Sequence, residues 1–151
     1  MQELDVYATG YSENEDEPTR VSGCGIVLIY TDKFRREVKR DFGFALRTST
    51  LELAHLQSAR IGLACMRPTF RDAKTRLRTA SPEVFRLLSS NGEHQSDKYQ
   101  AVLAETKRWI GYYTDFSVEL EPSQSPFLQR AKFLAQQAAV TQFHSDSGTI
   151  K

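Results

Sequence analysis

The stretch Thr50-Leu-Glu-Leu-Ala-His-Leu-Gln-Ser-Ala-Arg-Ile-Gly-Leu-Ala64 has the most regular pattern in the sequence. Leu53, Leu56 and Leu63 fit steps of three and four residues, which is the spacing of one face of an α-helix. The same stretch carries small residues that allow close packing, namely Ala54, Ser58, Ala59, Gly62 and Ala64. It therefore predicts a helix from about Thr50 to Met66 that lies against a sheet.

Strand patterns flank this helix on both sides. Before it, alternating or β-branched residues predict three consecutive strands, with Gly10 ending the first. An exposed loop, Tyr11–Ser22, and a short turn, Asp32-Lys33, connect them. The predicted strands are Leu4–Thr9, Gly23–Thr31, Arg36–Leu46, Lys74–Ala80 and Phe116–Glu121, and the further helices are Ser81–Leu88, Ser96–Tyr113 and Pro126–Phe143. This order predicts an α/β domain with a mixed sheet covered by helices.

The helical stretch and the element order together resemble the ribonuclease H family. In the family's first helix, a Thr is followed after three residues by Ala-Glu-Leu, and this chain reads Thr50, three residues, then Ala54-His55-Leu56. The resemblance covers about residues 3 to 142. It implies a five-stranded mixed sheet whose first three strands are antiparallel, flanked by about four helices.

The family's activity depends on four carboxylates around two divalent ions, and the resemblance places other residues at all four positions. Two ions activate water and stabilise the leaving oxygen, and magnesium requires hard oxygen ligands. The matching segments here are Ala8-Thr9-Gly10, Ala54-His55-Leu56, Thr79-Ala80-Ser81 and Leu128–Ala135, so the four positions are Thr9, His55, Ala80 and Lys132. The resemblance therefore implies a member without the catalytic carboxylates, with no metal and no cofactor.

Another metal site can be considered near the same helix. Glu52 lies one turn before His55, and Asp5 shares a strand face with Thr9, so a Glu-x-x-His pair plus one acid is conceivable. The alternative is that His55 makes a hydrogen bond at the sheet edge while Asp5 and Glu52 are solvated. This leaves an active ribonuclease with rearranged ligands as one hypothesis.

Composition limits the other function classes. The 151 residues are 40% hydrophobic and 26% charged, typical of one globular domain. No apolar run reaches the roughly 20 residues of a membrane span, and the N-terminus does not look like a signal peptide. Cys24 and Cys65 lack zinc-site spacing, so we interpret both as reduced core thiols of a cytoplasmic protein.

The net charge of +1 hides a basic middle, since Lys33 to Arg78 contains twelve Lys or Arg and four Asp or Glu. If nucleic acid binds, the candidate phosphate contacts are Lys33, Arg35, Arg36, Lys39 and Arg40. Solvated cations on a sheet edge are the common alternative. The acidic loop Glu13–Glu17, placed by the resemblance beside the substrate groove, argues against phosphate there.

A protein partner or self-association is the remaining hypothesis, and Tyr112 is the candidate contact, because Trp109 and Tyr113 fit a packing role better. We interpret residues 1–143 as a single ribonuclease H-like domain and 144–151 as a flexible tail. The favoured function is a catalytically inactive protein-binding or scaffolding module. The alternatives are a non-catalytic nucleic-acid-binding module and the rearranged nuclease.

Overall fold

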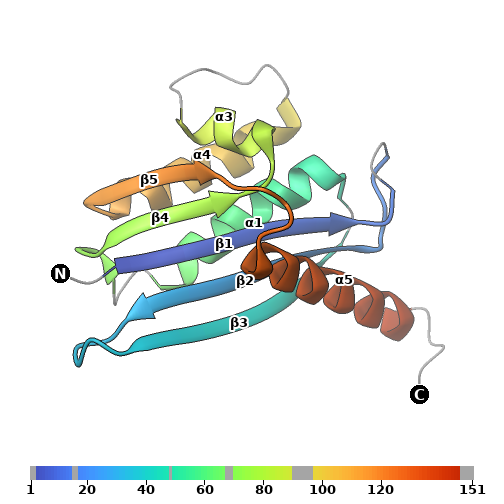
Figure 1. Cartoon of the computed structure of the whole chain (residues 1–151). Coiled ribbons are helices and arrows are strands. Elements are labelled where there is room, and N and C mark those ends of the chain that lie inside the picture. The colour runs from blue at the N-terminus through green and yellow to red at the C-terminus, as the bar shows by residue number, and fades with distance from the viewer. Residues whose placement is uncertain (1–2, 15–16, 48, 67–69, 90–96, 147–151) are drawn as a thin grey trace.

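The computed structural model describes residues 3–14, 17–47, 49–66, 70–89 and 97–146, which form nine helices and strands (Figure 1). In chain order they are β1 (Glu3–Ser12), β2 (Ser22–Thr31), β3 (Glu37–Leu46), α1 (Leu51–Cys65), β4 (Lys74–Thr79), α3 (Pro82–Ser89), α4 (Asp97–Tyr112), β5 (Asp115–Leu120) and α5 (Pro126–Asp146). The predicted order of elements is confirmed.

The strands form one five-stranded sheet in the order β3-β2-β1-β4-β5. β2 is antiparallel to both β1 and β3, whereas β4 is parallel to both β1 and β5. The predicted mixed sheet with three antiparallel strands first is therefore correct. The arrangement leaves β3 and β5 as the two edges.

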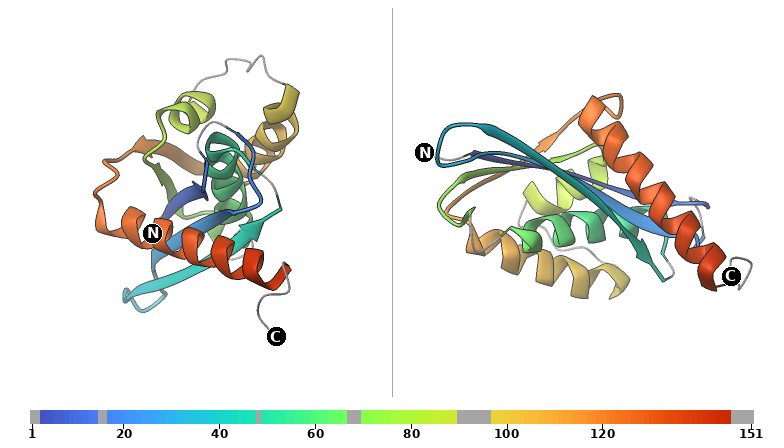
Figure 2. Two further views of the ribbon diagram at one scale, coloured as in Figure 1. Left: turned by 90° about the vertical axis from the view of Figure 1, so that its right-hand side faces the viewer. Right: turned by 90° about the horizontal axis from the view of Figure 1, so that it is seen from below.

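Helices cover the two faces unequally. α1, α3 and α4 lie on one face, while α5 alone crosses the other, over β1, β2 and β3 (Figures 1 and 2). We call these the α1 face and the α5 face. β2 lies between α1 and α5, which explains why it is buried from Ser22 to Leu28. The α5 face of β4 and β5 has no helix over it among the described elements (Figure 1).

The core lies mainly on the α1 face, between the sheet and the helices α1, α3 and α4. Leu4, Val6 and Ala8 alternate along β1 and are buried, whereas Asp5 and Tyr7 between them are partly exposed on the α5 face. This two-residue period is what a strand with one apolar face requires. The same core includes Tyr113 and partly buried Trp109, as predicted from their helical spacing.

Gly10 does not end the first strand, contrary to the prediction, because β1 continues to Ser12. Its lack of a side chain serves packing instead. A Cβ atom at this position would lie 2.3 Å from the backbone carbon of Ala54 and 2.4 Å from the backbone nitrogen of His55. Gly10 therefore lets α1 approach the strand backbone directly.

α1 begins as predicted, because the Thr50 side chain accepts a hydrogen bond from the amide of Leu53 at 3.2 Å and so caps the helix. Cys24 is buried, and burial raises the pKa of its thiol to about 12. The prediction that Cys65 is also a core thiol is wrong, since it is exposed at the end of the helix.

α5 extends to Asp146, three residues beyond the predicted end at Phe143, so part of the predicted tail is helical. Residues 147–151 lie outside the described residues. None of the described helices is both long and apolar enough to span a membrane.

Candidate functional site

The parallel pairing of β1 and β4 brings two of the four positions to one end of the sheet. Val6 is level with Leu77 and Tyr7 with Arg78. Continued by two residues, this register places Thr9 level with Ala80, where β4 has just ended. Both positions therefore lie at the carboxyl ends of neighbouring parallel strands, where open α/β sheets bind ligands.

α1 brings His55 to the same point. Because Gly10 allows the helix to touch the strand, the Gly10 amide donates a hydrogen bond to Nδ1 of the imidazole at 2.9 Å. The Thr9 hydroxyl lies 3.4 Å from the same nitrogen. Since Nδ1 accepts the amide proton, the neutral ring carries its own proton on Nε2.

α5 brings Lys132 to this point through a second glycine. Gly25 of β2 is paired with Thr9, and a Cβ on Gly25 would lie only 1.7 Å from the carbonyl oxygen of Ala131. The residue after Ala131 is Lys132, whose side chain is exposed. The backbone of α5 therefore contacts the sheet beside Thr9, and Lys132 is the next residue of the helix.

The charge of Lys132 acts on His55. Burial is the largest cause that lowers the pKa of the imidazole, Lys132 lowers it further, and Glu52 partly opposes both. The result is a pKa of about 4. His55 is therefore neutral at physiological pH, and the site combines a hydroxyl, a neutral imidazole, a methyl group and an ammonium group.

Asp5, the acid considered for a rearranged metal site, is not solvated. Its carboxylate accepts hydrogen bonds from Nε of Arg76 and from Nε of Arg78, both at 2.9 Å. Asp5 also precedes Thr9 by four residues, a separation of about 13 Å along a strand. The interpretation of Asp5 as a solvated side chain is wrong, and its carboxylate is held by two arginines.

Glu52 is exposed as expected, but its carboxylate accepts a hydrogen bond from the Tyr99 hydroxyl at 2.8 Å. Within the described ranges, no three His, Cys, Asp or Glu side chains gather in a way that could hold a metal ion. The acids considered for a rearranged site therefore do not assemble around His55.

A charged network on the open α5 face of β4 and β5 was missed by the sequence analysis. Arg78 Nη1 lies 2.6 Å from Glu119 and 2.5 Å from Glu121, while its Nε binds Asp5. Burial tends to lower the pKa of Arg78, but the bonds to Asp5 and Glu121 outweigh it and raise the pKa. The signal was available, because Arg76 and Arg78 alternate with Thr75, Leu77 and Thr79.

The five predicted phosphate contacts are all exposed. Lys33, Arg35 and Arg36 lie in the β2–β3 turn, which is at the other end of the sheet (Figure 1), whereas Lys39 and Arg40 lie within β3, paired with Ile29 and Leu28. Thr9 is level with Gly25, and β2 continues six more residues to Thr31, about 20 Å away, before the turn begins. The turn places Phe34 in solvent, 65% exposed, with Lys33 Nζ and Arg36 Cζ at 5.2 and 5.0 Å from its ring centroid. These cations form a separate basic surface.

Tyr112, the predicted partner contact, is half-buried near the end of α4. Its ring contacts Tyr113 edge-on and lies 5.3 Å from the guanidinium carbon of Arg71. Large apolar side chains that are more exposed occur elsewhere, at Phe34, Phe44, Leu120 and Phe133.

Comparison with known proteins gives matches in structure alone. No protein-family model and no curated protein sequence matches the chain. The RNase H1 of the halophilic archaeon Halobacterium salinarum aligns with a TM-score of 0.76 at 19% identity, over 92% of this chain and 98% of that one. The fold is ribonuclease H-like.

Further ribonuclease H structures align equally well. The N-terminal RNase H domain of a Mycobacterium tuberculosis protein matches at a TM-score of 0.76 and 16% identity, over 95% of this chain and 98% of that one. LC11-RNase H1, solved in complex with an RNA/DNA hybrid, matches at 0.77 and 14%, over 93% and 99%. The ribonuclease H-like fold thus accounts for nearly the whole chain.

Proposed function

We propose that this ribonuclease H-like domain does not hydrolyse nucleic acid by two-metal chemistry and serves as a binding module. The observation that carries this is the residue set itself: α5 contacts the sheet beside Thr9 at Ala131, next to Lys132, whose charge lowers the pKa of neutral His55, and the resemblance requires carboxylates at these positions. Divalent magnesium needs several hard oxygen ligands. Thr9 offers one hydroxyl and Ala80 none, while Lys132 repels a cation within a few ångströms.

The cleavage assay tests this directly. An RNA/DNA hybrid incubated with the protein and Mg²⁺ or Mn²⁺ should remain intact. Cleavage that is lost in His55→Ala or Asp5→Asn would instead establish a rearranged site and overturn the proposal.

A gain-of-function variant tests the assignment of the four positions. Combining Thr9→Asp, His55→Glu, Ala80→Asp and Lys132→Asp should create Mg²⁺ binding that the parent lacks. The readout is an Mg²⁺-dependent rise in melting temperature, because a ligand that binds only the folded state stabilises it. If the combined variant folds but shows no such rise, these positions do not form one metal site.

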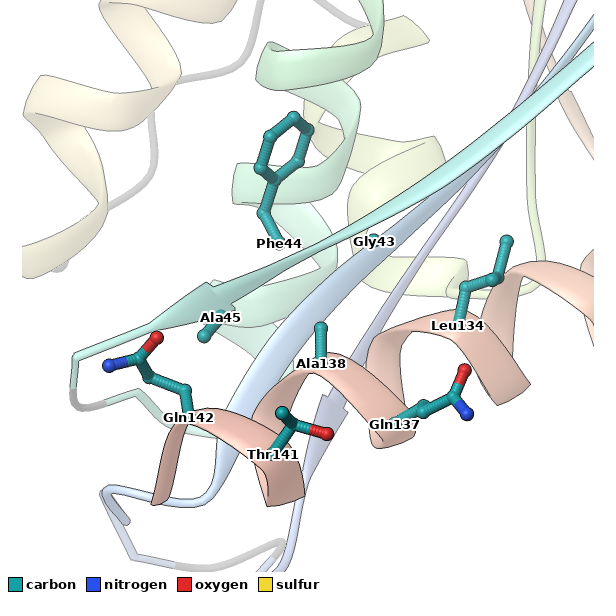
Figure 3. A pocket seen from close by; sticks show the side chains of 8 residues that line it. All are labelled: Gly43, Phe44, Ala45, Leu134, Gln137, Ala138, Thr141 and Gln142. Atoms are coloured by element: carbon teal, nitrogen blue, oxygen red, sulfur yellow. The ribbon is translucent and has the colours of Figure 1, made fainter. Parts of the chain in front are cut away.

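We further propose that the partner is a protein bound at the β3 edge. The surface concerned, called here the β3 edge surface, comprises Gly43, Phe44 and Ala45 of β3 with Leu134, Gln137, Ala138, Thr141 and Gln142 of α5 (Figure 3). These residues line a pocket of about 440 Å³. Phe44 is 43% exposed.

An exposed edge strand offers unpaired backbone groups that another strand can bind. β3 is ten residues long and terminates the sheet, so among the described elements no strand pairs with its outer side. Pull-down or cross-linking should place contacts on β3, and a Phe44→Arg variant should lose them while retaining its melting temperature. Contacts mapped only to α3 or α4 would contradict this surface.

Nucleic-acid binding is the second candidate, supported by exposed Phe34 and by the five exposed cations, three in the β2–β3 turn and two in the adjoining part of β3. A structural neighbour, LC11-RNase H1, was solved with an RNA/DNA hybrid. We rank it second because the turn, which holds three of the five cations, is about 20 Å or more from Thr9. The α5 face of β4 and β5 also carries Glu119 and Glu121, which repel phosphate.

Salt dependence separates the two candidates. Binding of labelled hybrid should weaken steeply as salt rises if phosphates are neutralised. Arg35→Glu with Arg36→Glu should abolish that binding, whereas Phe44→Arg should leave it unchanged. Retained binding in the double variant would exclude the β2–β3 turn as the contact.

A further inference from the structure

We propose that the protein bound at the β3 edge surface is a second copy of this chain, paired antiparallel along β3 about an axis through Phe42. This inference rests on the proposed protein-binding role and specifies the partner and its register. It follows from the pattern of faces along β3, the charges at its two ends and the pocket beside it.

The faces of β3 are fixed by contacts on either side. Phe44 is paired with Cys24, whose thiol donates to the Ala54 carbonyl of α1, so even-numbered residues lie on the α1 face. Asp41 binds Arg130 of α5 at 3.0 Å, so odd-numbered residues lie on the α5 face. Figure 3 shows the Phe44 side chain pointing away from α5.

A two-fold axis perpendicular to the sheet keeps each face on its own side. Even-numbered residues of one β3 therefore pair with even-numbered residues of the other. This excludes half of all registers, and like charges exclude others. If the axis passes through Arg40, that residue faces the partner's Arg40, and an axis through Asp41 likewise brings two aspartates together. An axis through Gly43 places Lys39 opposite the partner's Arg47.

Centring the pair on Phe42 removes these conflicts and overlaps the whole strand. On the α1 face, Phe42 meets the partner's Phe42, Arg40 meets the partner's Phe44, and Val38 meets the partner's Leu46. Aromatic pairs and a cation over an aromatic ring are favourable cross-strand contacts. α1 makes its sheet contacts with β1 and β2, which leaves Phe44 exposed until a partner strand covers it.

On the α5 face, the same register places Glu37 opposite the partner's Arg47, and the symmetry produces this pair twice. Glu37 and Arg47 are both exposed, at the two ends of β3. The opposite charges are therefore positioned to select this register over its neighbours.

The pocket beside β3 accommodates the remaining residues. Gly43 and Ala45 have little or no side chain and lie opposite the partner's Asp41 and the partner's Lys39. Leu134 and Ala138 line the α5 side of the same pocket (Figure 3). The aliphatic stem of Lys39 can lie along this apolar lining with its ammonium beside Gln137 or Gln142.

The test is solution mass measured by light scattering over a roughly hundredfold concentration range. The mass should rise from the monomer value of 17.2 kDa towards twice that value. Glu37→Arg and Arg47→Glu should each raise the dissociation constant by roughly tenfold, because each variant opposes like charges in both symmetric pairs. The double variant, with the charges exchanged, should restore dimerisation.

Lys33→Glu is the matched control. It reverses one exposed charge in the β2–β3 turn, outside the paired segment, and should leave the dimer unchanged. A chain that stays monomeric throughout, or a double variant that fails to recover, overturns the inference. A monomer that does not cleave hybrid leaves the non-catalytic proposal standing, whereas a dimer that cleaves it overturns only that proposal.

Discussion

The imidazole of His55 accepts the backbone amide proton of Gly10 at Nδ1, 2.9 Å away, and this bond ties the first turns of α1 to the end of β1. Gly10 provides the amide and, by lacking a side chain, also allows the approach. The bond requires Nδ1 to be unprotonated, so the charge state of His55 is coupled to the contact between helix and strand.

Stability should therefore fall in acid by an amount that depends on His55. Its pKa is about 4 in the folded protein, against about 6.5 in an unfolded chain. As pH falls below about 6.5, the unfolded state takes up the proton first, so the folded state loses stability until pH reaches about 4. The loss should be about 3 kcal/mol, measured by urea unfolding at several pH values.

His55→Gln removes the titrating group, so its pH profile should be flatter over this window while carboxylate titration is retained. Lys132→Met should raise the pKa of His55, because the ammonium is one of the causes that lower it. NMR titration of the imidazole measures this. An unchanged pKa in Lys132→Met would show that Lys132 does not lie near the ring.

Gly10 and Gly25, which allow α1 and α5 to contact the sheet backbone, should not tolerate substitution by alanine. Gly25→Ala places a methyl group 1.7 Å from the carbonyl oxygen of Ala131, and Gly10→Ala places one 2.3 Å from the backbone of Ala54. Backbone must move in both cases, so each should cost about 3 kcal/mol or more in unfolding free energy.

Gly111→Ala is the control for these two variants. A methyl group on this helical glycine would meet nothing within 4 Å, so alanine should stabilise α4 by up to about 1 kcal/mol. Equal losses at all three glycines would show that backbone contact is not what distinguishes Gly10 and Gly25.

Removing the Arg78 guanidinium should destabilise the open face of the sheet. Arg78→Met leaves Glu121 without this cation and Asp5 with Arg76 alone. Because these side chains are only 17–19% exposed, the loss should be about 2 kcal/mol.

Arg86→Met provides the comparison at the surface. Arg86 pairs with Glu83 at 2.6 Å, but its side chain is 56% exposed, so water screens the pair and the change should have little effect on the unfolding free energy. Thermal unfolding of both variants in low and high salt checks the difference. Equal effects would mean that water screens the Arg78 network fully.

The β2–β3 turn should be stabilised by Arg35→Gly. Arg35 has a φ of 62°, in the left-handed region that favours glycine. Asp32 accepts amide protons from Phe34 and Arg36 and so maintains the turn around this residue. The gain should be about 0.5–1 kcal/mol by chemical denaturation. Lys33→Gly, which removes the same charge at an ordinary φ, should give no gain.

The fold was predictable because the spacing of apolar residues within each segment indicates whether it forms a helix or a strand. The apolar spacing around Leu53 and Leu56 predicts α1, and alternation predicts β1 and β5. The resemblance then supplied the sheet type. The misplaced end of β1 at Gly10 has a physical reason, since only the tertiary contact with α1 distinguishes a packing glycine from one that ends a strand.

The surroundings of the site were less accessible from sequence. Asp5 and Arg78 are 73 residues apart, and their bond depends on a parallel register that no single segment encodes. Cys65 follows buried Leu63 by two residues, so it lies off the buried side of α1 and is exposed. The alternation of arginine with buried residues in β4 could have revealed a charged face of the strand. It could not have revealed the acids that pair with Arg76 and Arg78.

The contact of α1 with Gly10 and of α5 with Gly25 means that main chain, and not side chains, sets the spacing around Thr9. Lys132, whose side chain is exposed, can therefore be exchanged with little demand on the rest of the molecule, whereas a replacement for His55 must still accept the Gly10 amide proton. A different functional group could be introduced at Lys132 while the backbones of α1, α5 and β1 keep their positions. This makes the position a suitable target for directed evolution.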